Sequence, residues 1–250
     1  MIVVGIDLAA EARRTSVAVL RDDPAPVLEH VLVGATDEDL VAAIETAGRT
    51  GVDVPLGWPA RFVDLVSAHA TASLPAPAST GSDWRRSLAM RVTDRDVHRR
   101  TGLTPLSVST DRIAYPALRW AGIEARLREQ GTDVSRDGSG AVIEVYPAAA
   151  LRCWSLPHRG YKETKNAGAR LGLVTELEAR TPWLDWNGHR DLCAADDNAL
   201  DAVIAALITR EASLGACEPP PEDLREIARQ EGWIWLPSAP GPTAPSAPCC

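Results

Sequence analysis

Carboxylate side chains occur at three points where the sequence otherwise predicts buried strands. Asp7 directly follows the apolar run VVGI, Asp53 lies within VDVP, and Glu144 lies within VIEVYP. An unpaired charge inside a protein core is costly, so each acid requires a metal cation, a basic partner or water. For any one of these acids taken alone, the simpler interpretation is a strand-end carboxylate paired with an arginine.

Two more acids, Asp197 and Asp201, lie in the segment CAADDNALDAVIAALITRE, residues 193–211, which has the pattern of a helix. Counting by three and four along this helix places both acids on one stripe with two isoleucines. Asp196 or Asp197 could cap the helix by accepting bonds from backbone N–H groups. Asp201 lies a full turn further in, beyond easy capping reach, which favours a functional role for it.

The predicted topology brings these acids to one edge of a sheet. There they would form a carboxylate cluster drawn from Asp7, Asp53, Glu144, Asp197 and Asp201. Carboxylates held close together repel one another unless a divalent cation neutralises them. Mg²⁺ and Mn²⁺ prefer such oxygen ligands, and two ions about 4 Å apart can activate water for phosphodiester cleavage.

The elements that would position the acids follow the order β-β-β-α-β, an insertion, then β-α-α. The runs IVVGIDLA, RTSVAVLRD and APVLEHVLVG predict three strands in quick succession, which is typical of an antiparallel meander. A helix beginning at Thr36 or Asp37 leads to the short strand GVDVP, and regular structure resumes at GAVIEVYP. This order predicts an α/β fold with an RNase H-like mixed sheet, an antiparallel meander plus parallel strands, flanked by helices.

A single domain is predicted over residues 1–236. Residues 60–139 have an irregular pattern, with a Pro/Ala/Ser-rich loop and basic and helical stretches, and we interpret them as an insertion between the fourth and fifth strands. Residues 237–250 are rich in proline, alanine and serine, which predicts a disordered tail.

Composition narrows the class of protein. The net charge of −8 argues against a strong nonspecific grip on nucleic acid. No run approaches the roughly 20 apolar residues of a membrane-spanning helix, and no signal peptide precedes the first strand, so we expect a cytoplasmic protein with no membrane partner. The five cysteines form no CxxC pair, which disfavours a zinc site or a disulfide framework.

Basic residues near the acidic segments are candidates for contact with substrate phosphates. Lys162 and Lys165, the two lysines of the chain, suit phosphate binding, although a solvated helix entrance explains them equally well. Arg91 and Arg95 either contact phosphates or hold the insertion against the core through ion pairs. Further arginines at 85, 86, 99 and 100 form a local basic patch where a nucleic-acid backbone could lie, although charge-rich segments are usually solvated surface.

An ordered set of motifs resembles one known family. GIDLA, VDVPLGWP, RVTDRDVHRRTG, VIEVYPAAALR, YKETK with Arg170 after it, DDNALDAVIAAL and EGWIWLP are similar, in order, to the domain-of-unknown-function 429 family over about residues 2–237. The resemblance implies an RNase H-like fold and predicted nuclease activity. It also implies an acidic core of Asp7, Glu144 and Asp201, with Asp53 and Asp197 as further candidates. ALDAVIAAL also resembles the last-helix acid motif of Holliday-junction resolvases.

The leading hypothesis is a metal-dependent nuclease that cleaves DNA or RNA. Asp7, Glu144 and Asp201 would bind Mg²⁺ or Mn²⁺, and Asp53 and Asp197 would complete the catalytic set. Because a fold does not determine a function, two alternatives remain open. One is another phosphoryl-transfer or nucleotide-handling enzyme, and the other is a non-catalytic binding module in which the carboxylates are structural.

Overall fold

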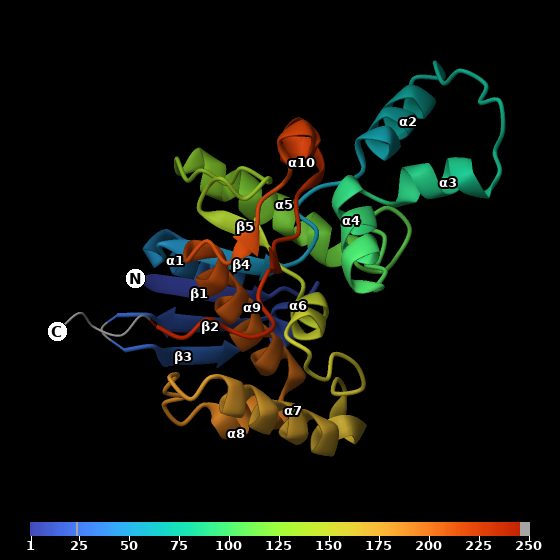
Figure 1. Ribbon diagram of the computed structural model, residues 1–250. Coiled ribbons are helices and arrows are strands. Elements are labelled where there is room, and N and C mark those ends of the chain that lie inside the picture. Colours follow the sequence, from blue (N-terminus) through green and yellow to red (C-terminus); the bar gives the residue numbers. More distant parts are fainter. Residues whose placement is uncertain (24, 246–250) are drawn as a thin grey trace.

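A five-stranded mixed sheet forms the centre of the computed structural model, which describes residues 1–23 and 25–245 (Figure 1). The strands are β1 Ile2–Asp7, β2 Ser16–Arg21, β3 Val27–Val33, β4 Arg49–Asp53 and β5 Val142–Glu144. Their order is β3-β2-β1-β4-β5, antiparallel from β3 to β1 and parallel from β1 to β5. The prediction of an α/β fold, with an antiparallel meander extended by parallel strands as in RNase H-like cores, is confirmed.

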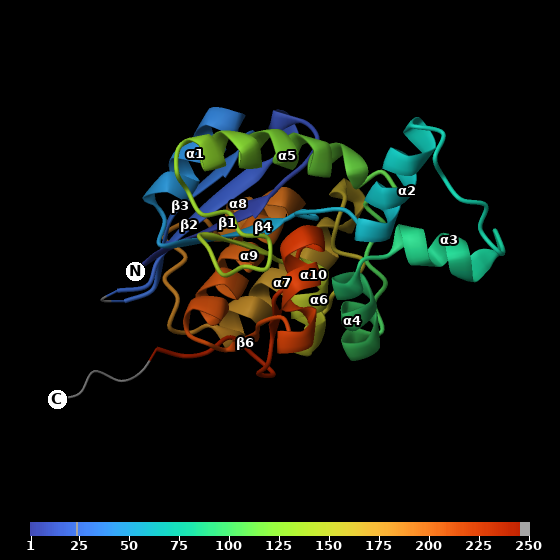
Figure 2. The same ribbon diagram turned by 90° about the horizontal axis from the view of Figure 1, so that it is seen from above.

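Helices cover both faces of this sheet. The helices of the described chain are α1 Asp37–Thr46, α2 Ala60–Ala70, α3 Ser82–Ala89, α4 Val92–Thr101, α5 Ala114–Glu129, α6 Pro147–Cys153, α7 Ala167–Arg180, α8 Arg190–Ala195, α9 Asp197–Ser213 and α10 Arg225–Glu231. Figure 2 shows α1 and α5 on one side of the strands and α9 with α7 on the other. Three short 3-10 turns (Ala12–Arg14, Thr164–Asn166, Glu222–Leu224) and a small β6–β7 pair (Cys217–Glu218, Leu236–Pro237) complete the fold.

Two glycines allow α9 to lie directly on the parallel strands. Gly5 of β1 and Gly51 of β4 are partners in the strand register. A side chain at Gly5 would overlap the backbone of Ala202 and Ala206 in α9, and one at Gly51 would overlap Thr209. Because side chains alternate along a strand, the residues two positions further on face the same helix. The aspartates at the ends of both strands therefore point towards the first turns of α9.

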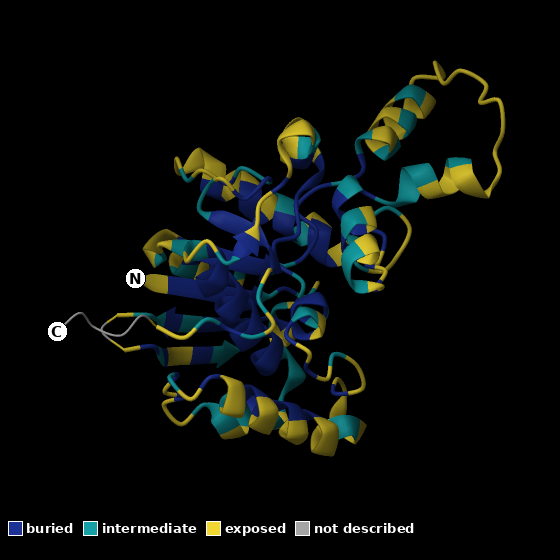
Figure 3. Cartoon of the chain, in the orientation of Figure 1, coloured by how far each residue is buried: buried dark blue, intermediate teal, exposed yellow. Residues whose placement is uncertain are grey.

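The first residues of α9 confirm one sequence interpretation. The Asp196 carboxylate caps the helix by accepting hydrogen bonds from the backbone N–H groups of Asn198 (2.8 Å) and Ala199 (3.0 Å). Such a cap satisfies N–H groups that have no partner within the helix. From Ala199 to Ala212 every residue of α9 is buried, so this helix is the centre of the larger core (Figure 3).

The inserted segment contains two different parts. No residue of α2 or α3 is buried, and Figures 1 and 3 show this pair as an exposed arm that projects from the sheet. By contrast, α5 packs Trp120, Ile123 and Leu127 against the strands and belongs to the core. The inserted segment therefore contributes a helix, α5, that covers one face of the sheet, as well as the exposed arm.

The C-terminal segment differs from the prediction of disorder from residue 237 onwards. Pro237 lies in β7 opposite Cys217. The Thr243 N–H donates to Glu211 (2.9 Å), and Arg210 donates to the Thr243 carbonyl (2.6 Å). Specific hydrogen bonds to α9 therefore fix this low-complexity stretch, while residues 246–250 lie outside the described part of the chain. Among the described residues, no helix has the length and apolar character required to cross a bilayer.

Candidate metal centre

Three aspartates from distant parts of the chain converge at the carboxyl ends of the parallel strands. Asp7 ends β1 and Asp53 ends β4, and the two residues are register partners in adjacent strands. Asp201 faces them from α9, directly before Ala202, where the part of the helix that lies on Gly5 and Gly51 begins. One carboxylate oxygen from each of the three residues lies within 4.8 Å of the others.

Burial and mutual repulsion make this group costly without a counter-charge. Asp201 is 1% exposed, while Asp7 and Asp53 are partly buried. Burial raises the pKa of Asp7 well above its usual value, and the charges of Asp201 and Asp53 raise it further. Burial likewise raises the pKa of Asp53 to about 7. A donor set of three carboxylates suits a hard divalent cation such as Mg²⁺ or Mn²⁺, which would relieve both costs.

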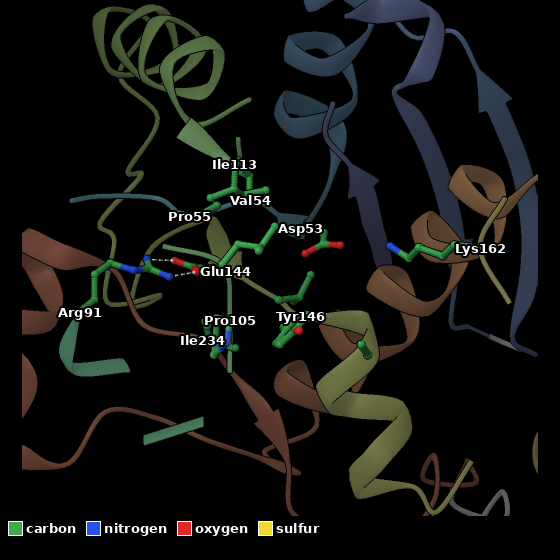
Figure 4. A pocket seen from close by; sticks show the side chains of 13 residues that line it. Asp53, Val54, Pro55, Arg91, Pro105, Ile113, Glu144, Tyr146, Lys162 and Ile234 are labelled. Atoms are coloured by element: carbon green, nitrogen blue, oxygen red, sulfur yellow. Dashed lines mark hydrogen bonds and ion pairs between the residues drawn. The ribbon is translucent and has the colours of Figure 1, made fainter. Parts of the chain in front are cut away.

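Two residues of the YKE segment (residues 161–163) hold the Asp201 side chain in place. The Tyr161 hydroxyl donates to Oδ1 of Asp201 (2.8 Å), and the Lys162 ammonium pairs with Oδ2 (2.5 Å). The negative charge of Asp201 is the main cause of a raised pKa for Lys162. The Lys162 side chain is half-exposed, so its ammonium reaches the aspartates from the solvent side. Figure 4 shows this ammonium directed towards the Asp53 carboxylate.

Arg170 fixes the segment that presents Lys162. This buried arginine donates to the carbonyls of Tyr161 (2.9 Å) and Ala195 (2.7 Å), which ties the segment to the end of α8, two residues before α9 begins. Asp197 adds a second tie by accepting a hydrogen bond from the Glu163 N–H (3.1 Å). The structure therefore places Asp197 in the support of the site, outside the group of three.

Glu144, predicted from the sequence as a metal ligand, occupies a different position. Its register partner in β4 is Val52, one residue before Asp53, and Val52 packs on the α1–α5 side of the sheet. A shift of one residue turns a strand side chain to the opposite face. Glu144 is consequently ion-paired with Arg91, with distances of 2.7 Å to Oε1 and 2.8 Å to Oε2. This is the strand-end pair with arginine that the sequence left as the simpler interpretation.

The four basic residues predicted to bind substrate have different positions and partners in the structure. Arg91 is buried and also pairs with Asp94 (2.8 Å), so it holds the insertion against the core. Arg95 is exposed and donates to the Met90 carbonyl, while Lys165 pairs with the exposed Glu163 (2.9 Å). Within the part of the chain that the structure describes, Lys162 is the one of these four that pairs with the aspartate group.

A pocket of about 260 Å³ opens beside the aspartates (Figure 4). Asp53 and Lys162 form one end of its lining, and the Glu144–Arg91 pair lies at the other. Tyr146, which follows β5, forms part of the wall. Sequence reasoning assigned no role to Tyr146, Tyr161 or Arg170. The motifs EVYP and YKETK were the available indications that these residues accompany the acids.

Comparison with known proteins gives one match. A family model described as "Protein of unknown function (DUF429)" matches residues 5–226, a span that contains all three aspartates, Lys162 and Arg91. No curated protein and no solved structure matches the chain.

The raised pKa of Asp53 predicts a pH-dependent stability of the metal-free protein. An aspartate in an unfolded chain has a pKa of about 3.9, whereas Asp53 in the folded protein has a pKa of about 7. Because the folded state binds the proton more tightly, this contribution is fully present below about pH 4 and is lost as the pH rises through 7. Urea denaturation in EDTA should therefore show a fall in stability between pH 4 and 8, and Asp53→Asn should reduce that fall. If the stability of the variant fell with pH as steeply as that of the wild type, Asp53 would not be the cause of the fall.

Proposed function

The chain belongs to the DUF429 family of proteins of unknown function, and we propose that this member is a metal-dependent nuclease that hydrolyses phosphodiester bonds of DNA or RNA. The observation that carries the proposal is the group of three aspartates with oxygens within 4.8 Å of one another. We place the activity in the cytoplasm, where the free thiols of Cys153, Cys193 and Cys217 would remain reduced.

Asp7, Asp53 and Asp201 would hold Mg²⁺ or Mn²⁺. When bound, the cation would supply Lewis-acid stabilisation of phosphate oxygens and a water of lowered pKa. The surrounding residues have defined tasks in this arrangement. Tyr161 and Arg170 hold Asp201 and the YKE segment in place, and the Lys162 ammonium, already at the acidic group, would bind a non-bridging oxygen of the phosphate.

Basic side chains on the projecting arm and on the neighbouring helix α4 support a nucleic-acid substrate. Arg85 of α3 and Arg95 of α4 donate to the backbone carbonyls of Thr80 and Met90. Both side chains are exposed, and Arg85 belongs to the basic patch identified from the sequence. Phosphate contacts of this kind position a polynucleotide without reading its sequence.

A divalent-metal screen over nucleic-acid substrates tests the proposal. We expect the purified protein to cleave at least one of single-stranded, duplex and branched DNA or RNA in the presence of Mn²⁺, and to lose this activity in EDTA. Failure to cleave any of these substrates with either Mg²⁺ or Mn²⁺ would remove the nuclease assignment.

One observation favours a second candidate, a non-catalytic binding module. The Lys162 ammonium, 2.5 Å from Oδ2 of Asp201, could serve as a permanent counter-charge for the acids. Metal binding distinguishes the two candidates. For the nuclease, Mn²⁺ at 100 times its Kd should stabilise the wild-type fold by about 2.7 kcal/mol, and Asp201→Asn should remove most of this gain. Thermal unfolding at increasing Mn²⁺ concentrations measures it, and an unchanged Tm in the wild type would favour the binding module.

A further inference from the structure

The pocket beside the aspartates, called the slot below, has apolar side chains on two sides (Figure 4). Val54, which follows β4, and Ile113, which precedes α5, lie on one side of Glu144 in Figure 4, and Tyr146 and Ile234 lie on the other. Nothing in the assignment of metal ligands requires this slot. Its walls offer one aromatic ring and several aliphatic groups, which suit a flat, largely apolar group.

The two ends of the slot are polar in different ways. Asp53 and Lys162, at one end, belong to the metal centre described above. At the other end, the Glu144 carboxylate accepts hydrogen bonds from Arg91 and from the Leu56 N–H (3.0 Å). A ligand that spans the slot would therefore combine a phosphate at one end with a flat ring that carries hydrogen-bonding groups at the other. A nucleotide has this chemistry.

We propose that this pocket holds one unpaired nucleobase of the substrate, with the adjoining phosphate at Asp53 and Lys162. The inference rests on the proposed nuclease function and narrows its substrate class. A base inside a duplex is stacked and paired, so it enters such a slot only from a single strand, a frayed end or a flipped-out position. The enzyme is therefore selective for single-stranded or locally unpaired nucleic acid.

The size of the effect follows from base stacking. Loss of one base–aromatic contact lowers affinity by roughly tenfold to a hundredfold, whatever the identity of the base. Single-stranded oligonucleotides with one abasic position, moved along the strand, should therefore be cleaved by the wild-type protein with a rate loss of about this size. The loss should occur at one fixed offset from the scissile phosphate. Duplexes of the same sequence should be cleaved more slowly than single strands.

A pocket-filling variant gives an independent comparison. Leu106 lines the pocket and is 47% exposed, so Leu106→Trp would place bulk in the slot with little cost to the core. Leu214, at the far end of α9 and 46% exposed, offers the matched control Leu214→Trp. We expect Leu106→Trp to slow cleavage of single strands and to remove the effect of the abasic position. Leu214→Trp should change neither.

A binding measurement separates this inference from the proposed function. The probe is a single strand that carries the fluorescent base 2-aminopurine, whose emission falls on stacking. Wild-type protein and Leu214→Trp should quench it, and Leu106→Trp should not. Quenching without cleavage of any strand would retain the base pocket and remove the nuclease. Cleavage that is indifferent to abasic positions, or the absence of quenching, would overturn the pocket assignment and leave the nuclease proposal standing wherever strands are cut.

Discussion

Asp7→Asn is expected to lower Mn²⁺-dependent cleavage by about 100- to 1000-fold, the loss typical of removing one pre-organised electrostatic group. Asp7 is the register partner of Asp53 and lies within 4.8 Å of both other aspartates, so its carboxylate contributes directly to the group of three. Asparagine has nearly the same shape but no charge. The affinity for the cation should fall while the sheet and α9 keep their packing.

The same substitution should leave the metal-free fold at least as stable as the wild type at neutral pH. Burial and the charges of Asp201 and Asp53 raise the pKa of Asp7, so its ionised form opposes folding. Asparagine removes that repulsion. Cleavage rates and urea denaturation in EDTA, measured on the same preparation, separate a lost function from a lost fold.

The exposed Asp223 provides a matched control, because Asp223→Asn makes the same chemical change outside the group of three aspartates. It should leave both activity and stability close to those of the wild type. If Asp7→Asn retained more than about a tenth of the wild-type rate, the cation would not depend on this carboxylate. The three-aspartate site would then be wrong.

The order of the strands and helices could be predicted from the sequence, and so could the presence of Asp7 and Asp201 in the acidic group. Both depend on local sequence pattern. Apolar runs and caps define the strands and α9, and the meander followed by a crossover helix leaves few sheet topologies. The choice between Asp53 and Glu144 depends on the register of β4 against β5. Both short strands are buried on both faces, so their sequence carries no alternation that reveals which side chains face α9.

The residues that hold the site in place could not be predicted from sequence pattern, for a different reason. From the sequence alone, Arg170 is one more charged residue of α7, yet its hydrogen bonds reach the carbonyls of Tyr161, in a loop, and of Ala195, the last residue of α8. Such contacts depend on which distant segments meet after folding. For Arg91 the sequence left two roles open, phosphate contact or an ion pair that holds the insertion against the core, and its buried pairing with Glu144 and Asp94 selects the second.

Arg91→Met is expected to cost the fold about 3–5 kcal/mol, the range measured when one partner of a buried ion pair is removed. Burial disfavours the charged guanidinium, but Glu144 and Asp94 together raise the pKa of Arg91 above its usual value. Methionine fills a similar volume without charge. Both carboxylates would then be buried without their counter-ion, and the end of β5 would lose its tie to α4.

Glu144→Gln tests the same network from its other side and should cost less. Asp94 would still neutralise Arg91 (2.8 Å), and the amide oxygen could still accept a hydrogen bond from Leu56 or Arg91. Glutamine also removes a charge that burial disfavours, because burial raises the pKa of Glu144 against the opposing effect of Arg91. The midpoint of urea denaturation should therefore fall further for Arg91→Met than for Glu144→Gln.

The double variant Arg91→Met/Glu144→Gln determines whether the ion pair itself causes these losses. Once Arg91 is gone, the Glu144 carboxylate is a buried charge with no partner, so converting it to an amide should cost less in that background than in the wild type, or should restore stability. Additive losses would mean that the two side chains stabilise the fold independently. In that case the Arg91–Glu144 ion pair would not be the reason that Glu144 lies away from the aspartates. The register of β5 against β4 would alone explain the distance of Glu144 from the metal centre.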